Sequence, residues 1–486
     1  MSRSLAASTL LLAYDGLTAP AWVLRRIEAG AGGVVLFGHN VHDAEQVAAL
    51  TTALREARAD LVLAIDEEGG DVTRLEHRTG SSSPGNAALG AADSVELTRD
   101  VYGSIGAELH TLGLTMDFAP SVDVNTAIDN PVIGTRAFGA DQALVARHGA
   151  AAVDGLQRAG VAACVKHFPG HGSTTQDSHL VLPVVDEPVE RLRQRELVPF
   201  AAAIDAGVAA VMSAHIRVPS LTGHDPATHS QAVLTDLLRG DLGFTGVVVT
   251  DALDMYGVSG LVGVPEAAVR ALAAGADLLC LGAELREPEY DAVLDAVDAA
   301  LREGRLDAGA VERSRARSAD LVRRFPAAEP RVLTAAEEAA ADEVGLQAAR
   351  EAVQVEGPLR AMSAPYVVHL DNPPTIASGP VPWGLDGLPG ADAVVVADGS
   401  VQVDAVVAAA VGRDLVLVLR DAHRHPWVRD VVRAVARARP DAVVVEMGLP
   451  VWSPAPLTRI SCYGAARVCS VAVGERLLGR LRAAAR

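Results

Sequence analysis

The residues best suited to chemistry gather in one segment, CVKHFPGHGSTTQDSHLVLP, which covers residues 164–183. A cationic pair, Lys166-His167, ends a short apolar run, and a loop of small and polar residues then leads to Asp177 and His179. Lys166 is also the only lysine in the chain. A carboxylate can orient a neighbouring histidine and raise its basicity, and histidine exchanges protons near neutral pH. The spacing therefore indicates an acid/base pair, although a turn-forming Asp beside a surface His would give the same pattern.

Lys166 and Asp251 are each open to more than one interpretation. Lys166 could form a Schiff base, or with His167 it could bind phosphate or donate hydrogen bonds to hydroxyl groups. Asp251 directly follows the run GVVVT, where it could attack a substrate, stay ionised beside a developing cation, or cap the next helix. The histidines near these residues form no H-E-x-x-H or H-x-H pair, His423 and His425 read as part of a surface loop, and no Gly-rich stretch fits a phosphate fingerprint, so we expect no metal and no cofactor. The minority alternative is a metal site built from His167, His171, His179, His215 and Asp66.

The elements that position these residues repeat one pattern over residues 1–325. A short apolar run is followed by a polar or Gly-rich loop and then by a helix rich in Ala, Leu and Arg. The eight candidate strands span 9–14, 33–37, 61–65, 115–119, 161–165, 208–212, 246–250 and 277–281. The candidate helices span 17–29, 44–57, 95–112, 143–158, 189–206, 266–274 and 289–303. Strands that are apolar throughout indicate parallel strands buried on both faces, and eight such units predict an α/β fold of the (β/α)₈ TIM-barrel type. An open doubly wound sheet is the alternative.

The region after the barrel predicts a smaller domain. Residues 326–340 have the composition of a linker with a helix start. Apolar runs at 367–370, 393–397, 414–419 and 442–446 then alternate with candidate helices at 403–411 and 427–437. We therefore expect a catalytic barrel over 1–325, a linker over 326–340, and a three-layer α/β sandwich over 341–486.

The bulk composition limits the partners and the compartment. The formal net charge is −19 and there is no Lys/Arg tract, which argues against nucleic acid and anionic membranes. No run approaches the ~20 apolar residues that a membrane span needs, and the apolar run at 10–14 reads as a strand, not a signal peptide. The four cysteines form no metal-type pair, and so few of them suits a reducing compartment. We expect a cytoplasmic protein with no nucleic-acid or membrane partner, and the oligomeric state stays open.

Ionisable residues follow five successive strands of the expected barrel, from the third to the seventh. The carboxyl ends of barrel strands and the loops after them form the active face. These residues are Asp66, Glu67, Glu68 and Arg74 after the third strand, Asp123 and Arg136 after the fourth, Lys166 and His167 after the fifth, His215 after the sixth, and Asp251 and Asp254 after the seventh. One polar loop means little, but five on one face indicate an active site.

Several of these blocks resemble one enzyme family. The segment KHFPGHGSTTQDSH looks like the signature of the β-N-acetylhexosaminidase branch of glycoside hydrolase family 3. The blocks DEEGGDVTR, MDFAPSVDVN, NPVIGTRAFG, VMSAHI and GVVVTDALDM are similar to other blocks of that family and occur in the same order. The resemblance covers the barrel to about residue 325, and the second region is similar in layout to the α/β sandwich of two-domain members.

The resemblance implies a role for each matching residue. Asp251 matches the nucleophile, and Asp177 and His179 match an Asp–His dyad in which His179 is the general acid and then the base. The positions that match those holding the N-acetyl sugar are Asp66, Arg74, Arg136, Lys166 and His167. Glu67 stands where Gln is more usual and Asp71 where Arg is frequent, which puts the fine substrate preference in doubt.

The implied activity is that of a retaining exo-β-N-acetylglucosaminidase acting on cell-wall or chitin fragments through a covalent glycosyl-enzyme. A neutral histidine would also admit phosphate as the acceptor, so a β-N-acetylglucosaminide phosphorylase is the first alternative. A β-glucosidase or β-xylosidase, a non-catalytic sugar-binding relative and a Schiff-base lyase using Lys166 are the others. Because the dyad and Asp251 are all present, we expect a carbohydrate-cleaving enzyme.

Overall fold

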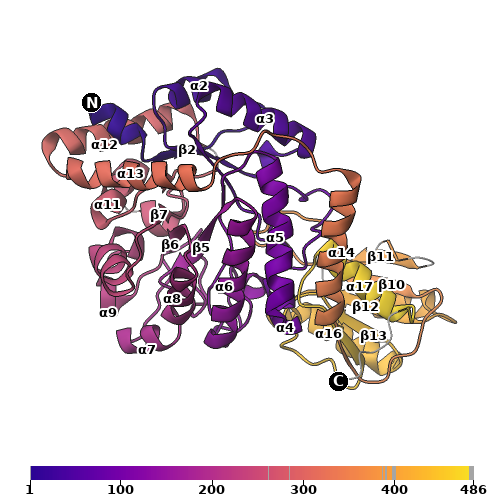
Figure 1. The fold of residues 1–486 in the computed structure, drawn as a ribbon. Helices are drawn as coiled ribbons and strands as arrows, with labels where there is room; N and C mark the ends of the chain where they lie inside the picture. Colours follow the sequence, from indigo (N-terminus) through magenta and orange to yellow (C-terminus); the bar gives the residue numbers. More distant parts are fainter. Residues whose placement is uncertain are drawn as a thin grey trace.

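The computed structural model describes residues 2–260, 262–283, 285–385, 387–388, 391–396 and 401–480. Two sheets organise these residues (Figure 1). One has eight parallel strands in the order β7-β6-β5-β4-β3-β2-β1-β8, and the bridge between Val249 and Leu278 joins β7 to β8. The predicted (β/α)₈ barrel is therefore confirmed, and the open doubly wound alternative is wrong.

The barrel strands are short and buried throughout. They are β1 (Leu10–Leu12), β2 (Gly33–Leu36), β3 (Val62–Ile65), β4 (Met116–Asp117), β5 (Ala162–Phe168), β6 (Ala210–Ser213), β7 (Val247–Thr250) and β8 (Leu279–Cys280). Alternate residues face opposite sides: Leu11 packs in the barrel interior, while Leu10 and Leu12 pack in the larger core under the helices. Both faces are apolar, and for this reason the strands read as unbroken hydrophobic runs in the sequence.

Helices surround the barrel and connect its strands. The α-helices of the barrel region are α1 (Ser2–Ala7), α2 (Ala21–Glu28), α3 (Ala44–Ala57), α4 (Asn86–Ala92), α5 (Val95–Thr111), α6 (Gln142–Arg158), α7 (Val189–Gln194), α8 (Leu197–Asp205), α9 (Pro219–Thr222), α10 (Tyr256–Ser259), α11 (Val264–Ala274), α12 (Glu287–Glu303) and α13 (Ala308–Arg324). The side chains of Asp43, Ser94 and Asp141 accept backbone hydrogen bonds at the starts of α3, α5 and α6. These caps satisfy amide groups that have no partner within the helix.

The second sheet has six strands in the order β11-β10-β12-β13-β14-β9. Its strands are β9 (Gln354–Glu356), β10 (Tyr366–Leu370), β11 (Asp392–Val396), β12 (Leu415–Leu419), β13 (Val443–Glu446) and β14 (Thr458–Ser461), and only β9 runs antiparallel to its neighbour. Val416 and Leu417 of β12 belong to two different cores, one under α14 (Ala335–Ala352) and α17 (Arg467–Leu477), the other under α15 (Val403–Ala409) and α16 (Pro426–Ala438). Helices cover both faces, which confirms the three-layer α/β sandwich.

Three predicted elements differ from the structure. The predicted helix 189–206 is two helices, α7 and α8; Pro199 sits in the first turn of α8, where its missing amide hydrogen is tolerated. Strand β5 extends to Phe168, so Lys166 and His167 lie within the strand and not after it. Helix α14 begins at Ala335, inside the predicted linker. The boundaries 1–325, 326–340 and 341–486 remain a prediction; Ala397, at the end of a predicted strand, and residues 481–486 lie outside the described part.

The second domain lies against the barrel through α14 and several loops. Helix α14 packs on α4 and α5 of the barrel and on α17 of the second domain, and in Figure 1 it runs beside α5 between the two parts. The amide of Ala465 donates to Asp71 Oδ1 at 3.0 Å, and Arg467 pairs with Glu76 at 3.2 Å. These contacts bring the second domain to the side of the barrel where β3 ends.

Candidate active site

One cavity of about 330 Å³ lies at the carboxyl ends of the barrel strands. Seven of the eight predicted site residues line it: Asp66, Arg74, Arg136, Lys166, His167, His179 and Asp251. The eighth, Asp177, accepts a hydrogen bond from one of these seven. The residues come from the carboxyl-terminal parts of different strands and the loops after them, and the closed barrel brings them together because parallel strands end on one face.

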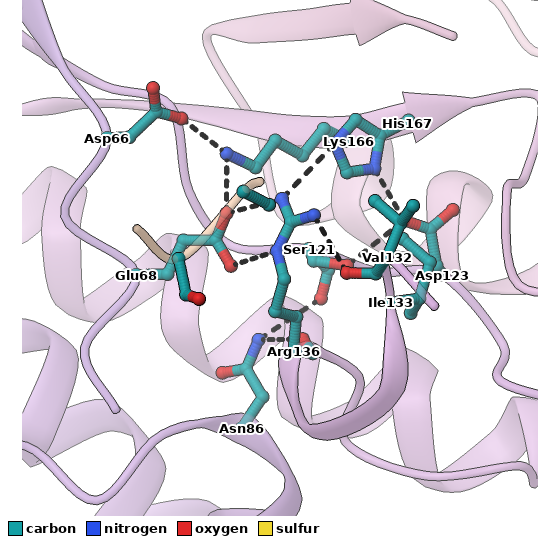
Figure 2. A network of polar contacts seen from close by, with 12 residues as sticks. Asp66, Glu68, Asn86, Ser121, Asp123, Val132, Ile133, Arg136, Lys166 and His167 are labelled. Atoms are coloured by element: carbon teal, nitrogen blue, oxygen red, sulfur yellow. Dashed lines mark hydrogen bonds and ion pairs between the residues drawn. The ribbon is translucent and has the colours of Figure 1, made fainter. Parts of the chain in front are cut away.

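Two cations share a buried carboxylate on one side of the cavity (Figure 2). Lys166 Nζ lies 2.6 Å from Asp66 Oδ1 and 2.7 Å from Glu68 Oε1. Arg136 donates to both oxygens of Glu68, at 2.7 and 3.0 Å. Although burial favours the neutral acid, Arg136 and Lys166 hold the pKa of Glu68 well below its usual range. Glu68 is therefore ionised, and it fixes the positions of both cations.

His167 is held from behind by Asp123, as Figure 2 also shows. Its Nδ1 lies 2.6 Å from Asp123 Oδ2, and Asp123 Oδ1 accepts the amide of His171 at 2.6 Å. Despite burial, the charges and hydrogen bonds of these two histidines lower the pKa of Asp123 to about 2. A carboxylate on Nδ1 leaves the other ring nitrogen of His167 directed toward the cavity side, where Arg136 Nη2 lies 3.4 Å away.

Asp177 and His179 form a hydrogen-bonded pair on the loop that follows β5. His179 Nδ1 lies 2.7 Å from Asp177 Oδ1, which also accepts the amide of His179 at 2.9 Å. Burial disfavours the imidazolium, but the hydrogen bond to Asp177 and the charge of Asp251 raise the pKa of His179 above its ordinary value. The bond to Nδ1 leaves Nε2 available to exchange a proton with a group in the cavity.

Asp251 is the carboxylate at the end of β7. The amide of Ala252 donates to its Oδ1 at 2.8 Å. Burial opposes ionisation, yet the imidazoles of His215, His167 and His179 lower the pKa of Asp251 to about 2. His215 uses both ring nitrogens within the protein, one with Thr228 Oγ1 at 2.8 Å and one with the carbonyl of Ala252 at 3.0 Å. Asp251 is thus ionised at neutral pH and faces the cavity.

Arg74 is positioned by its neighbour Glu67. The amides of Arg74 and Leu75 donate to Glu67 Oε2 at 2.7 and 3.0 Å. The Glu67 side chain is 4% exposed, and burial raises its pKa to about 7. The guanidinium of Arg74 reaches the second domain, where its Nη2 donates to the carbonyl of Ala377 at 3.1 Å.

The second domain contributes two residues that the sequence did not single out. Ile376 and Ala377, in the loop after β10, line the same cavity as Asp251. Ala377 also packs against the small apolar cluster of Val132, Ile133 and Ala137 on the barrel. Glu68 and Asp123 were noted in the sequence as ionisable residues, without a role. No local signal marks Ile376 or Ala377, because their contact with the barrel depends on how the two domains pack.

Within the described ranges, no cluster of three or more His, Cys, Asp or Glu side chains is arranged to hold a metal ion. The minority alternative of a histidine metal site also loses His215, whose two nitrogens already have partners. Across the same ranges no helix combines the length and the apolar character that crossing a membrane requires.

Comparison with known proteins agrees with the resemblance seen in the sequence. The profile "Glycosyl hydrolase family 3 N terminal domain" matches residues 24–321. Beta-hexosaminidase A of Pseudoalteromonas piscicida is 36% identical over 322 residues, which are 61% of this chain and 54% of that protein. The chain thus spans about half the length of this curated relative.

Two solved structures are also similar. The glycoside hydrolase family 3 beta-N-acetylglucosaminidase from Paenibacillus sp. str. FPU-7 is 33% identical, with a TM-score of 0.89, and the match covers 99% of this chain and 97% of that chain. A glycosyl hydrolase of the GH3 family from Mycobacterium smegmatis is 34% identical, with a TM-score of 0.60, and covers 66% of this chain with 97% of its own.

Proposed function

This chain belongs to glycosyl hydrolase family 3, and from that premise we propose that it is a retaining exo-β-N-acetylglucosaminidase. The observation that carries the proposal is the meeting of Asp251 and the Asp177–His179 pair at one cavity. A double displacement at a sugar carbon needs a nucleophile and an acid/base group; the ionised carboxylate can serve as the first and the histidine of raised pKa as the second. The names of the similar proteins support N-acetylglucosamine as the sugar.

In the first proposed step, Asp251 attacks the anomeric carbon. The bond from that carbon to the leaving oxygen breaks, and His179 Nε2 gives its proton to this oxygen. Asp177 keeps a proton on Nδ1 of His179 and stabilises the imidazolium that is present before this transfer. Asp251 needs no proton removed because its pKa is about 2.

In the second step, water adds to the covalent glycosyl-enzyme. His179 takes a proton from the water, the water oxygen bonds to the anomeric carbon, and the electron pair of the ester bond returns to Asp251. The configuration is inverted twice, so the sugar leaves with retention. A ring of donors and acceptors holds the sugar through its hydroxyl and acetamido groups: Asp66, Arg74, Arg136, Lys166 and His167.

The test is replacement of the nucleophile. Asp251→Ala should lower kcat on p-nitrophenyl N-acetylglucosaminide by about 10⁴-fold or more, because the covalent step loses its nucleophile. The matched control is Glu303→Gln, an exposed carboxylate at the end of α12. Full activity of Asp251→Ala, or a preference of the native enzyme for the corresponding glucoside, would overturn the assignment.

The compartment and the natural substrate are further parts of the proposal. All four cysteines are free and buried, which suits a reducing compartment, and we propose the cytoplasm. Fragments recycled from the cell wall or imported from chitin are the substrates that such a location allows.

A further inference from the structure

Asp254 is a carboxylate of the active-site cavity that the proposed mechanism does not use. It follows Asp251 on the loop after β7, and it lines the cavity together with Asp251 and His179. The residue is exposed. Its carboxylate lies directly over Gly282 at the end of β8: a Cβ added to Gly282 would stand 2.0 Å from Asp254 Oδ2. Only glycine at position 282 leaves room for this carboxylate.

Asp254 has no ion-pair partner among the described residues, unlike the cavity carboxylates Asp66 and Glu68. Asp66 and Glu68 pair with Lys166, and Glu68 also pairs with Arg136. Across the described ranges no ion pair involves Asp254. Burial and the like charge of Asp251 raise the pKa of Asp254, while backbone hydrogen bonds at Ala283 and Asp254 and the charge of His179 act in the opposite direction. Two carboxylates therefore face the space beside His179 through which an acceptor must approach.

From this placement we propose that Asp254 selects water over anionic acceptors and so makes the enzyme a hydrolase instead of a phosphorylase. The inference rests on the proposed function, because it concerns the second step of that reaction. An oxyanion that approaches the anomeric carbon meets the negative charges of Asp254 and of the carboxylate re-forming at Asp251. Water carries no charge and is not opposed.

The two competing steps differ in what the acceptor must lose. Water forms a bond from oxygen to the anomeric carbon, gives one proton to His179, and the ester electron pair returns to Asp251. A phosphate ion forms the same bond and releases the same ester pair through an oxygen that is already ionised, so its attack does not need a base to remove a proton. His179 therefore does not discriminate against phosphate, and the unpaired charge of Asp254 is the group in the cavity that does.

The test compares the products of the native enzyme, Asp254→Asn and Glu303→Gln, each with p-nitrophenyl N-acetylglucosaminide and saturating inorganic phosphate. Free sugar and sugar 1-phosphate are quantified by ³¹P NMR and chromatography. Removal of one like charge should raise the ratio of sugar 1-phosphate to free sugar by about tenfold or more in Asp254→Asn. The Glu303→Gln control should keep the native ratio. Asp254→Ala, which removes the charge without adding an amide donor, should change the ratio in the same direction.

The outcomes of this comparison separate the role of Asp254 from the glycosidase assignment. A native enzyme that already gives mainly sugar 1-phosphate, or an unchanged ratio in both Asp254 variants, overturns the inference while the glycosidase assignment stands. A native enzyme that releases no sugar in either buffer removes the proposed function and the inference together. A raised ratio in Asp254→Asn alone would point to the new amide as a phosphate ligand and would also count against the charge argument.

Discussion

Glu67 and Glu68 are adjacent in the chain and both are buried, but their pKa values shift in opposite directions because their partners differ. Glu68 meets Lys166 and Arg136 and is held ionised. Glu67 points the other way and meets the backbone amides of Arg74 and Leu75, so burial raises its pKa to about 7. One carboxylate therefore supports the cations of the cavity, and the other supports the loop that carries Arg74.

The Glu67→Gln variant should be more stable than the native protein at alkaline pH. The folded state keeps the Glu67 proton up to about pH 7, whereas an unfolded chain loses it near the usual pKa of about 4.3. Between these values the folded state binds more protons, so the free energy of unfolding falls as the pH rises. Gln does not titrate and can still accept the two amide hydrogen bonds. We expect a gain on the order of 1 to 3 kcal/mol above pH 7.

Urea unfolding of both proteins across the pH range measures this difference. The gain should shrink toward zero below about pH 4, where Glu is protonated in both states. Glu303→Gln, which changes an exposed side chain, is the control, and its stability difference from the native protein should show no such trend with pH. A difference that does not change with pH would mean that Glu67 is not the titrating group.

At the scale of single residues, the sequence predicted which side chains lie in the cavity but not how they pair. The positions of Asp66, Lys166 and Asp251 followed from the rule that strand ends share one face. The sharing of Glu68 by two cations, and the support of His167 by Asp123, depend on side-chain directions that spacing along the chain does not fix. Such pairs need the closed barrel before they can be recognised.

Among the elements, the loop between β5 and α7 has the most demanding task, because it carries the Asp177–His179 pair. It is tied to the barrel where Gly172 passes close to the loop after β4. The amide of Ala127 donates to the carbonyl of Gly172 at 3.0 Å, and a Cβ at position 172 would stand 2.0 Å from the carbonyl oxygen of Val124. Any side chain there must push the loop away from the barrel.

The Gly172→Ala variant should therefore displace His179 and lower kcat by about 10²-fold, the usual effect of a misplacement of about 1 Å. The loss should be larger for substrates with poor leaving groups than for dinitrophenyl glycosides, which need little protonation. Gly103→Ala, in α5, is the matched control, since a Cβ there meets nothing within 4 Å. Equal losses on both kinds of substrate would argue that the loop does not position the acid.

The strands were predictable as elements because long apolar runs bounded by glycine have few alternatives in an α/β fold. The residues at which the strands end were harder to predict. Strand β5 continues through Lys166 and His167, two residues that a hydrophobicity pattern places in a loop. They remain in the strand because each polar group finds a partner, Asp66 and Glu68 for the lysine and Asp123 for the histidine. Burial of charge is favourable only with such partners, and these come from other strands.

At the scale of the molecule, the second domain completes the wall of a cavity whose ionisable groups all come from the barrel. Ile376 and Ala377 line the cavity from the second domain, and Arg74 bonds the carbonyl of Ala377. The Mycobacterium smegmatis structure matches the chain over 66% of its length with nearly all of its own, so barrel-sized members of the family exist. We therefore expect the second domain to affect substrate binding more than the chemical steps.

Replacement of Asp71 can test whether the second domain takes part in substrate binding. Its Oδ1 accepts the amide of Ala465 at 3.0 Å, and its Oδ2 accepts the hydroxyl of Thr135 at 2.6 Å. These two hydrogen bonds place Asp71 at the contact between the domains. Asp71→Ala leaves the Ala465 amide without its acceptor, which should weaken the contact by about 1 to 3 kcal/mol.

The expected result is a rise in KM with little change in kcat, because the wall formed by Ile376 and Ala377 loosens while the barrel groups stay in place. Calorimetry should show the two domains unfolding further apart in temperature, since their coupling is reduced. Thr135→Val is the matched control, because it removes the hydrogen bond within the barrel and keeps the one to Ala465. If Thr135→Val raises KM as much as Asp71→Ala does, the effect arises within the barrel and the second domain has no part in binding.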